Sequence, residues 1–86
     1  MYNYQEQKKN VFTEDGQVTF LKIRDNVKNL LKQAGAVSMD RAIRVASGDS
    51  WTMMACVDRL VELGEIRELQ IGRVAGQDRI FVSVND

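Results

Sequence analysis

Few side chains in this sequence could carry out acid–base, nucleophilic or metal chemistry. The chain contains no histidine and a single cysteine, Cys56. Without an imidazole there is no Ser-His or Cys-His nucleophile, no histidine metal ligand and no histidine pH switch. The twelve aspartates and glutamates follow no spacing that indicates a paired acid and base. We therefore predict that the protein is not an enzyme, with no catalytic residues, no metal and no cofactor.

The length and composition are those of one small globular domain. Eighty-six residues, 44% of them hydrophobic and 28% charged, fall in the ordinary range for such domains. The apolar runs are too short to cross a membrane, and the polar N-terminus lacks the apolar core of a secretory signal. We expect a cytoplasmic protein.

Binding is the remaining class of function, and the charge distribution bears on what is bound. Twelve lysines and arginines balance twelve aspartates and glutamates. Residues 1–34 carry two more cations than anions, whereas residues 35–64 and residues 65–86 each carry one more anion. Affinity for duplex DNA comes mainly from neutralised phosphates, and the sequence has no overall basic excess to supply it.

Hydrophobic spacing predicts a first helix over residues 21–34. Its apolar residues recur at three- and four-residue intervals, from Phe20 through Ile23 and Val27 to Ala34. Thr19 is the expected N-cap, and Gly35 the expected stop.

Two further helices are expected before Gly64. The second runs from Ser38, whose hydroxyl can cap it, to Ala46, and the third begins at Asp49 or Ser50 and ends near residue 63. The inner face of the third helix is expected to bury four apolar residues, with Cys56 at its border as an inert thiol. These residues are Met53, Val57, Leu60 and Val61.

Beyond Gly64 the apolar period changes to two, which predicts a β-hairpin. One strand covers residues 66–71, the other residues 80–84, and residues 72–78 form a glycine-containing tip between them.

For the N-terminal region the sequence leaves alternative structures open. Residues 1–10 are polar and are expected to form a flexible tail, although Tyr2 and Tyr4 could instead dock on the domain or on a second copy. Residues 11–86 form the single domain. The Asp15-Gly16 pair between β-branched and aromatic residues favours a short hairpin over residues 11–20. The alternative is a helix that begins near Thr13 or Asp15.

The order of helix, short helix, tight turn, longer helix, glycine and hairpin resembles the winged helix-turn-helix superfamily. The likeness is carried by residues 27–31, residues 38–46 and above all residues 52–66, Thr-Met-Met-Ala-Cys-Val-Asp-Arg-Leu-Val-Glu-Leu-Gly-Glu-Ile. It implies an α+β fold in which a three-helix bundle leads into a C-terminal β-hairpin, the wing.

The resemblance implies a small DNA-binding protein, such as a transcriptional regulator, whose third helix enters the major groove of double-stranded DNA. The implied base-facing residues are Ser50, Trp51, Thr52, Ala55 and Arg59. The implied phosphate contacts are Arg41, Arg44 and, in the wing, Arg73.

A second hypothesis is that the same helix binds a protein. Its outward positions combine apolar groups with acids, which fits a protein interface better than phosphates. This patch consists of Trp51, Met54, Ala55, Asp58 and Glu62. A homodimer is compatible with either hypothesis. For the Trp51 ring we expect cover over the helix-turn-helix corner, the alternative being an exposed anchor for a partner.

Overall fold

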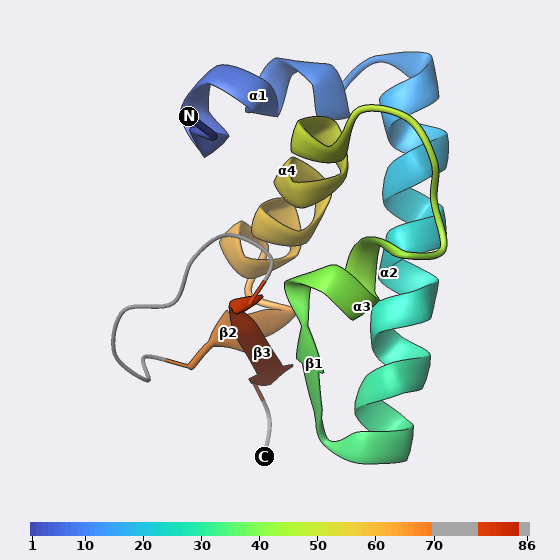
Figure 1. Cartoon of the computed structure of the whole chain (residues 1–86), viewed down its shortest axis with the longest axis vertical. Helices are drawn as coiled ribbons and strands as arrows, with labels where there is room; N and C mark the ends of the chain where they lie inside the picture. The colour runs from blue at the N-terminus through green and yellow to red at the C-terminus, as the bar shows by residue number, and fades with distance from the viewer. Residues whose placement is uncertain (70–77, 85–86) are drawn as a thin grey trace.

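The computed structural model describes residues 1–69 and 78–84, within which the chain forms four helices and a three-stranded antiparallel sheet. Helices α2 and α4 pack together, α1 crosses one end of α4, and the sheet lies beyond the other end (Figure 1). None of the helices in these residues is both long and apolar enough to cross a membrane. In chain order the elements are α1 (Tyr4–Val11), α2 (Glu14–Ala34), β1 (Ala36–Ser38), α3 (Met39–Ile43), α4 (Ser50–Glu62), β2 (Ile66–Glu68) and β3 (Ile80–Ser83).

Strand β3 is the centre of the sheet, with β1 on one side and β2 on the other. Phe81 of β3 lies opposite Val37 of β1 and Glu68 of β2, and its side chain is fully buried. The antiparallel pairing of β2 with β3 confirms that the two predicted strands pair. Strand β2 ends at Glu68 and β3 at Ser83, both earlier than predicted, and residues 70–77 of the predicted strand and tip lie outside the described residues. The arrangement is compatible with a winged helix-turn-helix. Strand β1 was not expected, because three residues are too few to show a period.

Side-chain caps begin α3 and α4 where the sequence indicates. Ser38 accepts a hydrogen bond from the Arg41 amide, and Asp49 accepts one from the Trp51 amide. Helix α3 ends at Ile43, three residues earlier than predicted. Gly64 follows α4 with a φ of +77°, the left-handed conformation that glycine adopts without steric cost.

The predicted hairpin over residues 11–20 is wrong, because helix α2 begins at Glu14 and continues to Ala34. The alternative, a helix beginning near Thr13, is confirmed. Thr13 is the N-cap and accepts a 3.0 Å hydrogen bond from the Gly16 amide, while two acids in the first turn suit the helix dipole. Gly16 serves close packing rather than a turn: a Cβ there would lie 1.9 Å from the carbonyl oxygen of Asn10.

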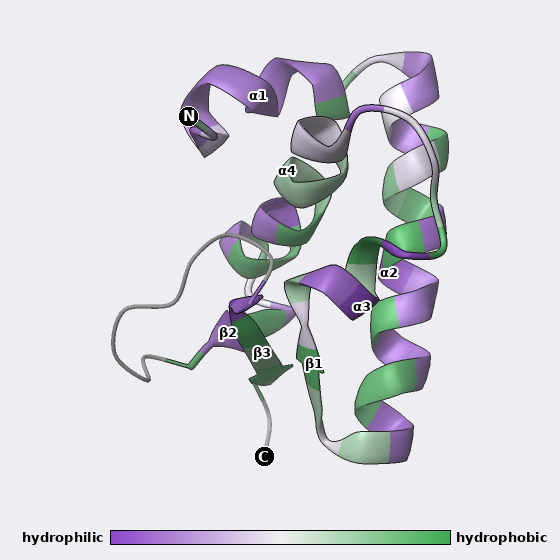
Figure 2. Cartoon of the chain, viewed as in Figure 1, coloured by the Kyte–Doolittle hydropathy of each residue, from purple (hydrophilic) through white to green (hydrophobic). Residues whose placement is uncertain are grey.

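Where a flexible tail was expected for residues 1–10, the structure has helix α1 over Tyr4–Val11. Asn3 caps it by accepting hydrogen bonds from the amides of Gln5 and Glu6. The helix is hydrophilic except in its last turn (Figure 2), and Val11 is its one buried residue. A helix with so little apolar surface gives no periodic signal in the sequence.

The core lies between α2, α4 and the sheet, and residues from every helix contribute to it. Its buried apolar residues are Val11, Phe20, Ile23, Val27, Val37, Met39, Ala42, Ile43, Met53, Met54, Ala55, Cys56, Val57, Leu60, Ile66 and Phe81.

Candidate functional site

Helix α4 carries both the predicted base-facing residues and the predicted protein-binding patch, which makes it the centre of the candidate site. Its inner face packs into the core as expected, with Met53, Val57 and Leu60 buried and Val61 partly so. Cys56 is fully buried as well, and burial raises the pKa of its thiol to about 11. A thiol with that pKa stays protonated at neutral pH, in agreement with the expected inert residue.

The outer face of α4 is covered by the N-terminal segment. Ala55 is 0% exposed and Met54 is 5% exposed, although the sequence placed both on the outward side. Ala55 lies one turn before Asp58 and Arg59, and both of these contact residues that precede α2. In this arrangement neither Met54 nor Ala55 is available to a DNA base or to a partner protein.

Asp58 belongs to a charged cluster that joins the N-terminus, α4 and the sheet. Arg79 donates to Asp58 at 2.7 and 3.3 Å and to Glu68 at 2.7 and 3.0 Å. Its guanidinium also lies 5.3 Å from the centre of the Phe81 ring. The phenol of Tyr2 donates to Asp58 at 2.6 Å. The hydrogen bonds from Arg79 to Glu68 and Asp58 raise its pKa, so its charge is permanent.

Burial and the hydrogen bond to Asp58 both raise the pKa of Tyr2 above its ordinary value. Tyr2 is therefore a neutral donor throughout the physiological range. The docking alternative for the two tyrosines is confirmed within this chain, since Tyr4 also reaches α4.

Glu62 is the second anchor for the N-terminal segment. It accepts from Lys8 at 2.7 Å, from Arg59 at 2.6 Å and from the Tyr4 phenol at 2.8 Å. These hydrogen bonds, with that of Lys8 first, lower the pKa of Glu62 to about 2. Both acids of the predicted patch thus have cationic partners, and neither presents an unpaired charge to solvent.

Four side chains on or next to α1 and α4 keep part of their surface exposed. Trp51 keeps 38% of its surface exposed, so its ring is only partly covered. The guanidinium of Arg59 lies 5.1 Å from the centre of the Phe12 ring, which is 53% exposed. Leu63, one turn beyond Arg59, is 46% exposed. We call Phe12, Trp51, Arg59 and Leu63 the α1–α4 surface.

The remaining DNA-facing candidates lie at the start of α4, on or next to α3, and in the hairpin tip. Ser50 is partly buried, and the hydroxyl of Thr52 donates to Asp49 at 2.9 Å as part of the helix cap. Arg44 pairs with Asp40 in the neighbouring turn. Arg41 is exposed on α3, and Arg73 lies outside the described residues.

A metal site needs several ligand side chains that converge on one point. Among residues 1–69 and 78–84, no three cysteine, aspartate or glutamate side chains converge in a way that could hold a metal ion. The acids that do approach one another, Asp58 and Glu68, share Arg79 as their cation.

Sequence reasoning missed three residues that shape this site. Arg79 was treated only as a charge in a hairpin, Phe12 as part of a strand, and Lys8 as part of a loose tail. Their partners on α4 lie 21 or more positions away in the sequence, so no local spacing could indicate the pairs. Comparison with known proteins finds no matching family model, no matching curated protein and no matching solved structure.

Proposed function

We propose that this chain is a winged helix-turn-helix domain that binds another protein rather than DNA, through the α1–α4 surface. The observation that carries the proposal is the cover that α1 places over the outer face of α4. In DNA-binding members of the superfamily the equivalent face enters the major groove. Here its centre is apolar, with Ala55 fully buried, and its two acids are bonded to the N-terminal segment.

The composition of the surface supports a protein partner. Tryptophan, phenylalanine and arginine are enriched at the centres of protein interfaces. Among the described residues, the exposed aromatic side chains are Trp51 in α4 and Phe12 at the end of α1. Arg59 is held over the Phe12 ring. Base-reading helices instead present arginine, lysine, asparagine or glutamine to the groove.

Co-purification tests the proposal with a matched control. Tagged wild-type protein, Trp51→Ala and Val45→Ala are recovered from native lysate. Val45 is 50% exposed but lies outside the α1–α4 surface, in the segment between α3 and α4. We expect a partner that is retained by wild type and Val45→Ala and lost from Trp51→Ala. Identical recovery by all three proteins contradicts the proposal.

A homodimer is the simplest form of protein partner. Sedimentation of the three proteins at several concentrations identifies it. Self-association that Trp51→Ala abolishes and Val45→Ala preserves makes the partner a second copy of the chain.

Double-stranded DNA is the second candidate, and the succession of α3, a short connection and α4 favours it. In that case α1 must move away from α4 before the helix can enter a groove. Fluorescence anisotropy on a mixed-sequence duplex at low salt compares wild type with the double variant Tyr2→Phe/Tyr4→Phe, in which two anchors of the N-terminal segment are lost. DNA binding that is stronger in the double variant supports this candidate. No binding by either protein at tens of micromolar counts against it, because nonspecific dissociation constants are roughly 1–100 μM at physiological salt.

A further inference from the structure

A groove lies between α2 and the sheet, on a part of the molecule that the proposed function does not use. Its volume is about 380 Å³, which lies within the range of roughly 300–1,000 Å³ for small-molecule sites. The floor is apolar: Val27, Leu60 and Ile66 are buried there, and Leu31 and Val84 extend it.

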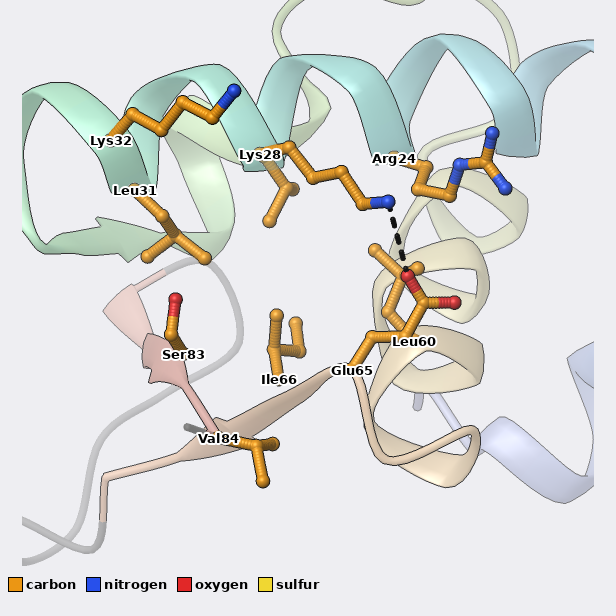
Figure 3. A pocket seen from close by; sticks show the side chains of 10 residues that line it. Arg24, Lys28, Leu31, Lys32, Leu60, Glu65, Ile66, Ser83 and Val84 are labelled. Atoms are coloured by element: carbon orange, nitrogen blue, oxygen red, sulfur yellow. Dashed lines mark ion pairs between the residues drawn. The ribbon is translucent and has the colours of Figure 1, made fainter. Parts of the chain in front are cut away.

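Three cations from α2 line the same groove. Arg24, Lys28 and Lys32 are spaced by four residues, so they follow one another along one side of the helix, with about 6 Å of rise between neighbours. One carboxylate, that of Glu65, lies across the groove and faces Lys28 (Figure 3). The groove therefore has an excess of positive charge, whereas the whole chain is neutral.

Two of these cations have hydrogen-bonding capacity that the described part of the chain does not use. The Nε atom of Arg24 is shielded from solvent and has no hydrogen-bond partner among the described residues. Its nearest carboxylate oxygen, that of Asp25, is 3.9 Å away. Lys28 reaches across the groove to Glu65, but the 3.7 Å separation is too long for a hydrogen bond (Figure 3). An atom that water cannot reach is also closed to a ligand oxygen, so a bound acceptor would pair with the terminal nitrogens of Arg24, which make no hydrogen bond within residues 1–69 and 78–84, and with Lys28.

We propose that this groove binds a medium-chain alkanoate, which has a carboxylate at one end and an apolar body. A carboxylate is acceptor-only and can take hydrogen bonds from both Arg24 and Lys28. An alkyl chain would cover the floor formed by Val27, Leu31 and Ile66. A phosphodiester backbone would match the cations but leave this floor in contact with water, and a neutral apolar molecule would leave the cations unpaired.

Octanoate is the probe, and its titration into the full-length protein is followed by amide shifts in ¹H–¹⁵N NMR spectra. Two matched ligands separate the two halves of the argument: acetate keeps the charge without the chain, and octan-1-ol keeps the chain without the charge. We expect saturable shifts around Val27, Leu31 and Ile66 with octanoate. Acetate should bind at least about tenfold more weakly, because each buried methylene contributes roughly 0.8 kcal/mol. Octan-1-ol should bind at least about threefold more weakly than octanoate, because it lacks the charge.

Variants of the charged residues test the polar half with opposite signs. Lys28→Gln should weaken octanoate binding about two- to fivefold, as expected for one partly exposed ion pair. Glu65→Gln should strengthen it, because the carboxylate that competes for Lys28 is lost. Lys22→Gln is the matched control, since Lys22 is exposed on the same helix and does not line the groove.

Several results would overturn the proposal. The first is an absence of shifts at about 10 mM octanoate, a concentration at which even a ligand with a millimolar dissociation constant is mostly bound. The second is binding of octan-1-ol as tight as that of octanoate. The third is equal weakening of octanoate binding by Lys22→Gln and Lys28→Gln. A mixed-sequence duplex that shifts the same amides and displaces octanoate would instead assign the cations to phosphates. If Lys28→Gln fails to fold, the comparison of the three ligands on wild-type protein and the Glu65→Gln variant still decide the question.

Discussion

The phenol of Tyr2 donates a 2.6 Å hydrogen bond to Oδ2 of Asp58, which lies 56 positions later in the chain. The same carboxylate accepts from Arg79, so the N-terminus, α4 and the segment leading into β3 meet at one side chain. Tyr2 precedes α1, so this hydrogen bond fastens the start of the helix to α4, while Tyr4 and Lys8 fasten it to Glu62. Access to the outer face of α4 therefore depends on these contacts together.

The Tyr2→Phe variant measures the strength of that contact. The ring is kept and the hydroxyl is lost, so the free energy of unfolding should fall by about 1–2 kcal/mol, because the hydrogen bond goes to a charged acceptor in a partly buried site. Urea unfolding monitored by circular dichroism gives the value. Tyr4→Phe is the control, and it should cost less because the bond of Tyr4 to Glu62 is exposed. Equal and negligible losses in both variants would show that α1 is held by other contacts.

Gly16→Ala tests the close packing of α1 on the first turn of α2. The added Cβ would lie 1.9 Å from the carbonyl oxygen of Asn10 and 2.8 Å from atoms of Val11, all of them backbone. Since backbone cannot rotate away, we expect a loss of about 2 kcal/mol or more, although alanine is the better helix former. Val18→Ala, at a 55% exposed position of the same helix, should change the stability by less than about 0.5 kcal/mol. A stabilised Gly16→Ala protein would contradict this packing.

The fold could be predicted where apolar residues repeat within one element. The helix predicted before Gly64 (α4), its Asp49 cap and its Gly64 stop are local patterns, and each is observed. The alternation of Ile80, Val82 and Val84 likewise predicts strand β3, although the residue that this strand buries is Phe81. Helix α1 has no such pattern, because it buries one residue, Val11, and is held by side-chain hydrogen bonds to distant positions.

The candidate site was harder to predict for the same reason. The periodicity of α4 separates the face toward α2 from the opposite face, but it does not show that a second helix packs on the latter. Met54, Ala55 and Asp58 were therefore placed on an outward patch. The partner of Asp58, Arg79, lies 21 positions away, beyond any helical or strand spacing.

Arg79→Gln tests whether the cluster that it forms with Asp58 and Glu68 stabilises the fold. The three side chains are 18%, 12% and 26% exposed, so removal of the cation leaves two poorly solvated carboxylates beside each other. We expect a loss of about 2–3 kcal/mol, below the 3–5 kcal/mol typical of a fully buried pair. Arg44→Gln is the control: Arg44 is 69% exposed in its pair with Asp40, and the loss should stay near about 0.5 kcal/mol.

A double-mutant cycle separates pairing from packing in this cluster. Asp58→Asn combined with Arg79→Gln should cost less than the sum of the two single variants, because the first change removes one of the unpaired charges. Additive losses would mean that Arg79 acts through Glu68 or through the Phe81 ring rather than through Asp58.

Glu62 makes the docking of α1 sensitive to acid. Its pKa is lowered to about 2 by hydrogen bonds from Lys8, Arg59 and Tyr4, whereas an unfolded chain would have the ordinary value of 4.5. A carboxylate with a lowered pKa in the folded state stabilises that state above pH 4.5, and the stabilisation is lost as the pH falls toward 2. Glu62→Gln removes this contribution, so its stability relative to wild type should be lowest at pH 6 and should approach that of wild type near pH 2. Urea midpoints of both proteins from pH 6 to pH 2 measure the difference. A constant difference across this range would show that protonation of Glu62 is not coupled to the docking of α1.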